Sequence, residues 1–417
     1  MHAPADAARL ILEHVRTLEP RRVPLRDALD LVLAEPVASP IDLPALNNSA
    51  MDGYAVRAAD VAGAAPERPA LLRVIETVPA GRFPTVPLGP GEATRIFTGA
   101  PLPEGADGVV RQEDTEPRTD GLVAVTADRD ARRNVRSRGE DIRQGHVVLQ
   151  PGDALGPAQL GVLASIAQAE PLVHRRPRVA YLASGDEIVD LDRRDEILAG
   201  RKTATSNSYT LDALIRRTAA EPLDLGIARD AKDSLREHIA RRGDADLLVT
   251  TGGVSVGEHD LLRELVTELG GEVKLWRVRM RPGSPLAFGT LDGRPWIGLP
   301  GNPVSTMVTF ELFVRPVIRR LLGHPLPFRR TVRVRLMEPV TLGPRLRHYL
   351  RATVDVDGRE GPTAAHLTGP QGSGILTSMA RANALLIVPE ELTAVPAGAI
   401  LDARLLDEPR HVAEPPF

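Results

Sequence analysis

The chain has 417 residues and a formal net charge of −3, with 42% hydrophobic and 26% charged residues. This length predicts two to four domains of a globular protein. The small net charge and the 3% of aromatic residues exclude a general basic field and leave few stacking surfaces, so we expect no nucleic-acid partner.

Cysteine is absent from the chain, which excludes disulfides, thiolate nucleophiles and cysteine–zinc sites. Only three of the 52 basic residues are lysines, so an arginine here can occupy a place where related chains carry lysine. The N-terminal segment lacks the apolar core of a signal peptide, and the longest uncharged runs are too short to span a membrane. We therefore expect a cytoplasmic protein without a membrane partner.

The first predicted elements are helical, because apolar residues recur at helical spacing over 5–36 with a break at Pro20. From 37 to about 150, short apolar runs broken by Gly and Pro predict strands and turns. Residues 154–169 are again compatible with a helix.

Strands alternate with helices from 178 to 322, which predicts βαβ units and a doubly wound parallel sheet covered on both faces. One of these helices is predicted to begin with Asn207 or Ser208 as its N-cap. An Asp-Gly turn predicts a hairpin in LAFGTLDGRPWIGL, and a long helix is expected over about 303–322. After Pro325, short strands predict a small β domain.

Three polar segments follow strands of the predicted sheet: SGDEI, TTGGVSVGEHD and GLPGNPVST. Ligands of open α/β sheets bind beyond the carboxyl ends of the strands, and glycine-rich turns that lead into helices favour anions. One such loop could be only a tight turn, but three at one edge favour binding. The P-loop, dinucleotide, HExxH and GxSxG patterns are absent. The remaining carboxylates, hydroxyls and arginines suit Mg²⁺ and chemistry on a phosphate or another oxyanion.

The chain resembles the molybdopterin molybdenumtransferase family, which includes the bacterial MoeA proteins and the E domain of gephyrin. The resemblance rests on motifs in family order over nearly the whole chain: NNSAMDGYAVRAAD, IFTGAPLPEGAD, RGEDI, ASGDEI, TTGGVSVGEHD, RPGSPLAFG and GLPGNPVS. It implies insertion of molybdate into adenylylated molybdopterin with release of AMP, and a requirement for Mg²⁺. It also implies a homodimer with sites between subunits and a molybdopterin adenylyltransferase as substrate donor.

The expected fold class is a multidomain α/β protein with a central doubly wound domain of the molybdopterin-binding type. We expect a discontinuous helical domain over 1–40 and 142–176, with a β-rich domain inserted at 41–141. The doubly wound α/β domain is expected over 177–324, and a β barrel-like domain over 325–417.

The resemblance also implies site residues. The catalytic candidates are Asp52, Thr98, Asp141, Glu187 and Asp260, of which Glu187 and Asp260 would also bind the metal. Taken alone, Asp52, Thr98 and Asp141 would be interpreted as turn or loop residues, and Asp260 as a helix cap. The substrate-binding candidates are Ser206, Asn207, Gly252, Gly253, Val254, Ser255, Gly257, Pro300, Gly301, Asn302 and Ser305. Ser206 and Asn207 could instead be only caps.

The molybdate position of the family corresponds to Arg281, Ser284, Pro285, Arg351 and Ser373. Fixed cations and hydroxyl donors suit a tetrahedral dianion. Two positions depart from the family pattern: Ser284 stands where a lysine is usual, and Thr205 stands where an aspartate is common.

Two alternatives to the enzyme remain, one suggested by these departures and one by the similar fold of a molybdopterin adenylyltransferase domain. A non-catalytic paralogue that binds molybdopterin or acts as a scaffold is favoured by the altered positions and disfavoured by the intact carboxylates. A molybdopterin adenylyltransferase is disfavoured by the additional N-terminal and C-terminal domains.

Overall fold

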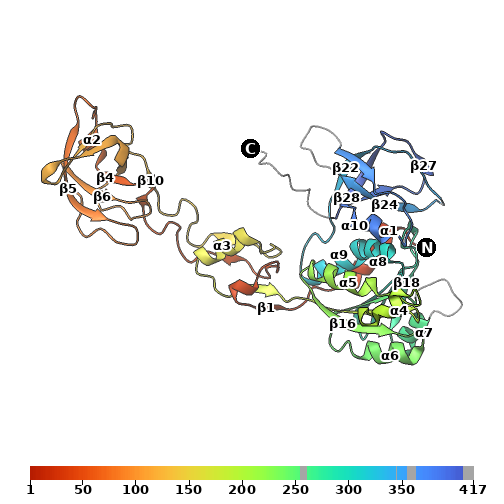
Figure 1. Cartoon of the computed structure of the whole chain (residues 1–417). Coiled ribbons are helices and arrows are strands. Elements are labelled where there is room, and N and C mark those ends of the chain that lie inside the picture. Colours follow the sequence, from red (N-terminus) through yellow and green to blue (C-terminus); the bar gives the residue numbers. More distant parts are fainter. Residues whose placement is uncertain (254–260, 344, 355–362, 407–417) are drawn as a thin grey trace. The chain divides into compact units, whose positions relative to one another are not determined.

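The computed structural model describes residues 1–253, 261–343, 345–354 and 363–406 (Figure 1). None of the helices in these ranges combines the length and apolarity needed to cross a bilayer.

The chain forms two compact units. The first comprises Met1–Ala34, Gly152–Gly156 and Glu170–Phe417, and the second comprises Glu35–Pro151 and Pro157–Ala169.

The second unit is built on a six-stranded sheet in the order β7-β4-β6-β5-β9-β8. The strands are β4 (Gly53–Val56), β5 (Ala70–Val78), β6 (Glu92–Ile96), β7 (Gly108–Arg111), β8 (Thr115–Pro117) and β9 (Leu122–Val125). Apolar residues of these strands, including Val56, Leu72 and Val123, form its core. Short ladders join β2 (Val37–Ala38) to β11 (Val147–Leu149) and β3 (Asn48–Ser49) to β10 (Val135–Arg136), and a helix, α3 (Pro157–Ser165), completes the unit. The predicted strands and turns of this region are confirmed.

The first unit contains a second six-stranded sheet in the order β16-β13-β17-β21-β20-β18. Its strands are β13 (Arg178–Ser184), β16 (Glu221–Ala228), β17 (Leu247–Thr251), β18 (Glu272–Trp276), β20 (Ala287–Leu291) and β21 (Arg294–Leu299). The first four in sheet order are parallel, and the last two pair antiparallel. The hairpin β20–β21 turns at Asp292 and Gly293, both with positive φ, as the Asp-Gly signal predicts.

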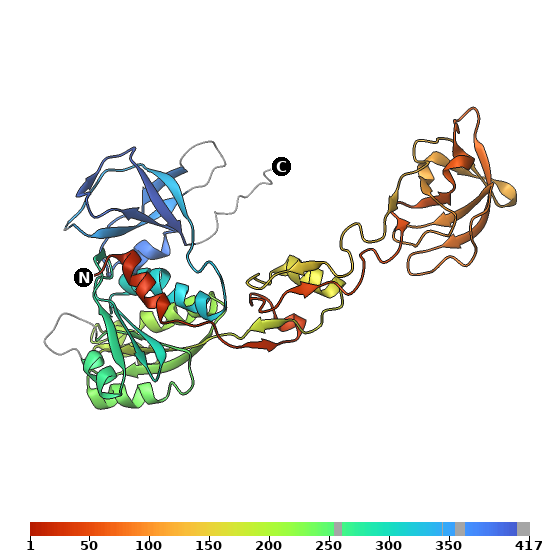
Figure 2. The same ribbon diagram turned by 180° about the vertical axis from the view of Figure 1, so that it is seen from behind.

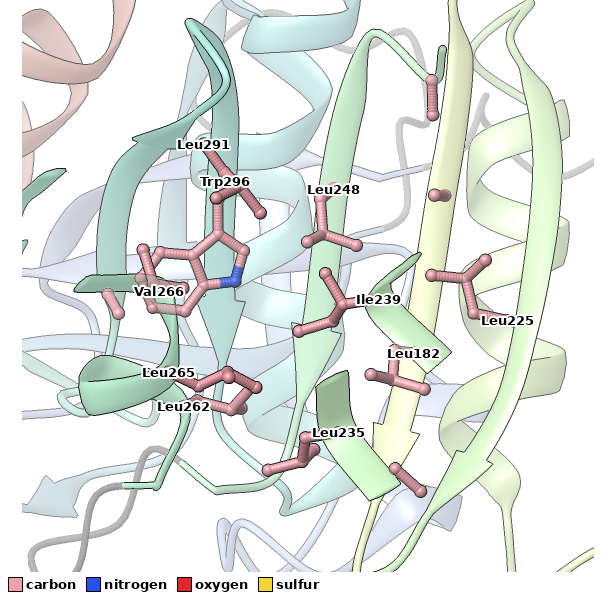
Figure 3. Packing of buried hydrophobic residues seen from close by; sticks show 14 residues of the cluster. Leu182, Leu225, Leu235, Ile239, Leu248, Leu262, Leu265, Val266, Leu291 and Trp296 are labelled. Atoms are coloured by element: carbon pink, nitrogen blue, oxygen red, sulfur yellow. The ribbon is translucent and has the colours of Figure 1, made fainter. Parts of the chain in front are cut away.

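Helices cover both faces of this sheet. On one face, α6 (Lys232–Ala240) and α7 (Leu261–Glu268) pack Leu235, Ile239 and Leu265 against Leu182, Leu248 and Trp296 of the strands (Figure 3). The helices of the other face are α1 (Pro4–Glu13), α5 (Ser206–Arg216), α8 (Pro303–Thr309) and α9 (Arg315–Leu321); α1 runs beside α9 (Figure 2). A π-helical turn, Phe310–Val314, joins α8 to α9, so the predicted helix over 303–322 is continuous.

The C-terminal part of the same unit is a closed five-stranded barrel in the order β24-β25-β22-β28-β26, in which β26 also pairs with β24. The strands are β22 (Thr331–Leu336), β24 (Arg347–Val354), β25 (Thr363–Leu367), β26 (Ala384–Val388) and β28 (Ile400–Leu405). A two-residue strand, β19 (Met280–Arg281), adds to β24 and connects the barrel to the sheet domain. The expected fold class, with a doubly wound sheet, an inserted β-rich domain and a C-terminal barrel, is confirmed.

Two local predictions are wrong. Residues 25–33 form only a 3₁₀ turn, Leu25–Asp27, followed by bridges from Val32 and Leu33 to Ala154 and Val173. Leu31, Val32 and Leu33 are all at most 1% exposed, and an exposed helix cannot bury three consecutive side chains on one face. The predicted N-caps Asn207 and Ser208 lie inside α5, whose N-cap is Thr205.

Candidate active site

A cavity of about 840 Å³ lies beyond the carboxyl ends of β13, β17 and β21. Its lining includes these predicted site residues: Glu187, Ser206, Asn207, Gly252, Gly253, Pro285, Pro300, Gly301 and Asn302. The structure therefore brings the three polar loops together at one edge of the sheet. Ser305 is 4% exposed and bonds through its carbonyl to Thr309 inside α8. Val254, Ser255, Gly257 and Asp260 lie outside the described residues.

Glycine is required at two positions of this edge. Gly252 has a φ of 86°, and a Cβ there would lie 2.4 Å from the Ser184 carbonyl oxygen. Gly253 has a φ of 64°, and its Cβ would lie 2.9 Å from Cδ1 of Leu262. The positive φ values and these close approaches alone explain both glycines, although both also line the cavity.

Asn207 connects two of the loops. Its side chain is 5% exposed, and Nδ2 donates to the Gly301 carbonyl at 2.8 Å and to Oγ1 of Thr251 at 3.2 Å. Because the Gly301 carbonyl can only accept, this bond fixes the orientation of the amide. Its Oδ1 is buried without a hydrogen-bond partner among the described residues. The side chain of Asn207 therefore holds two loops of the site together and does not cap a helix.

Thr205 adjoins Asn207 in the cavity wall. It is 3% exposed, and its hydroxyl lies 2.7 Å from the hydroxyl of Ser208. The position where the family commonly has an aspartate thus holds an uncharged, internally bonded side chain.

Carboxylates line another part of the cavity. Glu187 is joined there by Asp230, which follows β16 and is not among the predicted site residues. Burial raises the pKa of Asp230, and the charges of Asp186 and Glu187 raise that pKa further. Asp230 also follows the carboxyl end of a parallel strand, so the rule that identified the other loops could have found it. Within the described ranges, no three acidic or histidine side chains converge as a set of metal ligands.

The barrel contributes a loop to the same cavity. Gly374 lines the cavity, Ser373 Oγ accepts from Nδ2 of Asn302 at 3.1 Å, and the Ser373 carbonyl accepts from the Val304 amide at 3.2 Å. These bonds tie the loop to the start of α8.

Arg351 of β24 is hydrogen-bonded to the same barrel loop. It is 0% exposed, and its guanidinium donates to the Gly372 carbonyl at 3.0 Å and to Oγ of Ser378 at 3.1 Å. No carboxylate is among these partners, and Nη1 lacks a hydrogen-bond partner in the described part of the chain. Burial lowers the pKa of Arg351 to about 10. Arg351 is thus a buried cation whose charge is not compensated by a described neighbour.

The RPGSP segment, residues 281–285, does not share the contacts of the barrel loop. Arg281 is exposed on β19. The Ser284 hydroxyl donates to the Val278 carbonyl at 2.8 Å, whereas Pro285 lines the cavity. Gly283 allows a close approach to α8, because a Cβ there would lie 2.5 Å from Cγ2 of Thr309.

The candidates Asp52 and Thr98 meet in the second unit. Oδ1 of Asp52 accepts from the Thr98 amide and from the Thr98 hydroxyl, both at 2.8 Å. The bond from the Thr98 amide, then that from its hydroxyl, and a smaller contribution from Arg95, lower the pKa of Asp52. Gly53 beside it permits close strand pairing, since a Cβ would lie 2.0 Å from the Val110 carbonyl oxygen.

Asp141 occupies another part of the second unit. Its amide donates to the Leu43 carbonyl at 3.0 Å, and its exposed side chain lines a smaller cavity of about 360 Å³ beside α3.

The chain matches known proteins along nearly its whole length. Family models match it at 3–167 (MoeA N-terminal region, domain I and II), 180–320 (probable molybdopterin binding domain) and 333–406 (MoeA C-terminal region, domain IV). It is 37% identical to molybdopterin molybdenumtransferase 2 of Mycobacterium tuberculosis over 96% of this chain and 98% of that protein. The corresponding protein of a Nostoc species is 36% identical, over 94% of this chain and 91% of its own length.

A solved structure agrees with this match. The molybdopterin biosynthesis MoeA protein from Pyrococcus horikoshii is 31% identical, and the alignment covers 97% of this chain and 99% of that one with a TM-score of 0.80. The order of the three matched regions, the named relatives and the shared fold lead to one conclusion: the chain belongs to the MoeA family of molybdopterin molybdenumtransferases.

Proposed function

We propose that the protein inserts molybdate into adenylylated molybdopterin with release of AMP, in the cytoplasm. The observation that carries this proposal is the bond between Asn302 and Ser373. It joins the loops at the sheet edge, which would hold the pterin substrate, to the barrel loop in front of Arg351. A pterin site and an oxyanion site are thereby brought to one cavity, as a transfer between the two substrates requires.

The oxyanion site is proposed at Arg351 and Ser373, beside Arg281 and Pro285 of the neighbouring segment. The Ser284 hydroxyl of that segment donates to the Val278 carbonyl and is not assigned to the oxyanion. The buried guanidinium has an unused donor and no described carboxylate partner. A tetrahedral dianion would supply both the missing acceptor and the missing charge. Because Arg351 is 0% exposed, the loop that contains Gly372 and Ser373 has to shift before molybdate can reach it.

Mg²⁺ is proposed to bind at the carboxylates of the cavity, Glu187 and Asp230, together with Asp260 from outside the described residues. Carboxylate oxygens suit this ion. The pKa of Asp230 is raised first by burial and then by the charges of Asp186 and Glu187, and a cation would offset the effect of these charges. With Thr205 in place of an aspartate, binding should be weak in the absence of substrate. Thermal unfolding with and without Mg²⁺ tests this directly, because a bound ion raises the unfolding temperature. No rise at saturating Mg²⁺ would remove the metal from the proposal.

The active protein is proposed to be a homodimer in which Asp52, Thr98 and Asp141 of one subunit complete the cavity of the other. The support is that Asp52 and Thr98 are bonded in a configuration suited to a site, yet belong to a different unit from the sheet edge. Mixing an Asp52→Ala chain with an Asp230→Asn chain should restore part of the activity. A monomer at micromolar concentration, or two inactive variants that stay inactive when mixed, would contradict the shared site.

The enzyme activity itself is tested with adenylylated molybdopterin, molybdate and Mg²⁺. AMP should appear only when molybdate is present, and substrate delivery should be faster from a molybdopterin adenylyltransferase than from solution. Asp233→Asn provides a matched control for Asp230→Asn, since Asp233 is an exposed acid on α6 outside the cavity lining. Tight binding of the adenylylated pterin without turnover would instead identify a non-catalytic paralogue.

A further inference from the structure

A second large cavity lies at the opposite edge of the same sheet. It has a volume of about 720 Å³, and its lining includes Arg176, just before β13, and Glu221, the first residue of β16. The candidate active site lies beyond the other end of β13, roughly 20 Å away for a strand of seven residues. The two cavities are therefore separate, and the function proposed above makes no use of this one.

Four arginines line this second cavity: Arg21, Arg22, Arg26 and Arg176. The acidic residues in the lining are Asp27 and Glu221, so the formal charge of the lining is 4 − 2 = +2. Guanidinium groups stay protonated at all physiological pH values, and this positive charge is therefore permanent.

The arginines are carried by ordered backbone. Arg21 and Arg22 lie on β1 (Pro20–Arg22), which pairs with β12 (Leu172–His174), and Arg26 lies in the 3₁₀ turn that follows. The Arg176 guanidinium donates to the Leu29 carbonyl at 2.8 Å and to the Ala219 carbonyl at 3.3 Å. These neutral partners fix its position without cancelling its charge.

The charge of Arg26 is also available. Arg26 is exposed and forms no ion pair with any residue that the structure describes. Arg21 is exposed as well; its charge acts on Glu19, whose carboxylate is already held by Arg175. Two cations at the rim of a cavity are thus free to contact a ligand.

The apolar part of the lining limits the kind of ligand. Leu29 is 41% exposed, and buried Val23 and Leu31 also contribute to the wall. The volume is within the range of small-molecule sites, and arginine both pairs with phosphate and stacks on flat rings. We propose that this cavity binds a phosphorylated small molecule with a planar or apolar body, at a site separate from the active site.

The proposal is tested by calorimetry on the full-length chain with ADP, pyrophosphate and adenosine as probes. ADP should bind saturably, pyrophosphate more weakly, and adenosine without measurable affinity. The double variant R21A/R26A should weaken ADP binding at least about tenfold, since each lost charge-assisted hydrogen bond contributes on that scale. Added salt should weaken wild-type binding more than that of the variant.

The matched control is R330A/R333A, which removes two exposed arginines from the same unit outside the cavity lining. It should leave ADP affinity unchanged. ADP binding that survives R21A/R26A would come from another site, such as the candidate active site, and would overturn the proposal. The absence of saturable ADP binding to the wild-type chain would overturn it as well. Neither of these two results would contradict the proposed molybdate-dependent AMP release, which concerns the other cavity.

Discussion

The carboxyl edge of the parallel sheet and the Asp52–Thr98 pair present their polar groups in opposite ways. At the sheet edge, Asn207 and Thr205 are 5% and 3% exposed; Asn207 bonds to the Gly301 loop and Thr205 to Ser208. Arg351 of the barrel is 0% exposed and bonds to the Gly372 loop. In the second unit, Thr98 is exposed, Asp52 is half-buried, and the two side chains bond to each other.

This difference decides what a substitution can reveal. A buried polar group that loses its partner destabilises the folded chain, so a change at the sheet edge alters folding and chemistry together. A change at an exposed pair alters little except what the pair contacts. When activity and thermal unfolding are measured on the same variants, substitutions at the sheet edge should therefore change both. Substitutions at the exposed pair should change activity alone.

The largest expected effect is on activity at the exposed pair. Asp52→Ala should lower AMP release by roughly a hundredfold or more, the scale of a positioned acid–base or binding group. The thermal unfolding midpoint should stay within about 2 °C of wild type. Thr98→Ala removes one of the two bonds that lower the pKa of Asp52 and should have a smaller effect. A large fall in the unfolding midpoint of Asp52→Ala would show that this pair, like the sheet edge, also stabilises the fold, and would contradict the difference between the two regions.

The next effect is on stability at the sheet edge. Asn207→Asp would place a carboxylate oxygen opposite the Gly301 carbonyl, where Nδ2 now donates at 2.8 Å. Residue 207 is buried although Gly301 is exposed. A buried carboxylate that faces a carbonyl acceptor should destabilise the fold by roughly 2 kcal/mol.

Asn302→Asp is the matched control for this substitution. Asn302 is exposed, and its partner, the Ser373 hydroxyl, can rotate and donate to a carboxylate. Urea unfolding should therefore detect a loss in the first variant only. Equal stability of the two variants would show that the edge is not braced by Asn207.

Much of the fold could be predicted from the sequence because its signals are local. Alternating strands and helices, the Asp-Gly hairpin and the Gly/Pro-rich β segments all depend on residues close together in the chain. The segment 25–33 could not be predicted, because Val32 and Leu33 form bridges with Ala154 and Val173. Helical spacing in the sequence carries no information about such distant partners.

The site was predictable in its loops but not in its contacts. A strand that ends in a polar segment identifies the edge of the sheet, and this was enough to place Glu187 and Asn302 at one cavity. Asn207 was predicted there only from the family resemblance. The role of Asn207 depends on Gly301, which lies 94 positions away. The burial of Arg351 depends on the closure of the barrel. Neither fact leaves a pattern in the neighbouring residues.

A smaller effect on stability is expected at Asp230. Burial and the charges of Asp186 and Glu187 raise the pKa of Asp230 in the folded chain, so the folded state holds this proton more tightly than the unfolded state. The contribution of Asp230 to the free energy of unfolding is therefore fully present at low pH and is lost as the pH rises through the pKa that Asp230 has in the folded chain. Asp230→Asn lacks this loss and should be more stable near pH 7 by at most about 1 kcal/mol, because the residue is exposed and its carboxyl only partly desolvated, so that solvent screens the charges.

The advantage of Asp230→Asn should vanish below the pKa of an ordinary aspartate. Mg²⁺ should stabilise the wild type more than the variant, because the variant has lost a carboxylate. Thermal unfolding at several pH values, with and without Mg²⁺, measures both effects. A variant that is less stable than wild type at pH 7 would show that Asp230 makes a structural bond rather than suffering repulsion.

The smallest effect is expected at Ser284, which tests whether every polar group of the edge takes part in the site. Its hydroxyl donates to the Val278 carbonyl at 2.8 Å, so it is occupied by the backbone of its own segment. Ser284→Ala should lower stability by only about 0.5 kcal/mol, because the carbonyl of buried Val278 keeps a second hydrogen bond, from the Met280 amide at 2.9 Å. The KM for molybdate should change less than about twofold, whereas a lost hydrogen bond to an oxyanion would raise it about tenfold or more. A tenfold rise with unchanged stability would mean that the hydroxyl turns from Val278 to the oxyanion when the substrate binds, and Ser284 would then belong to the site.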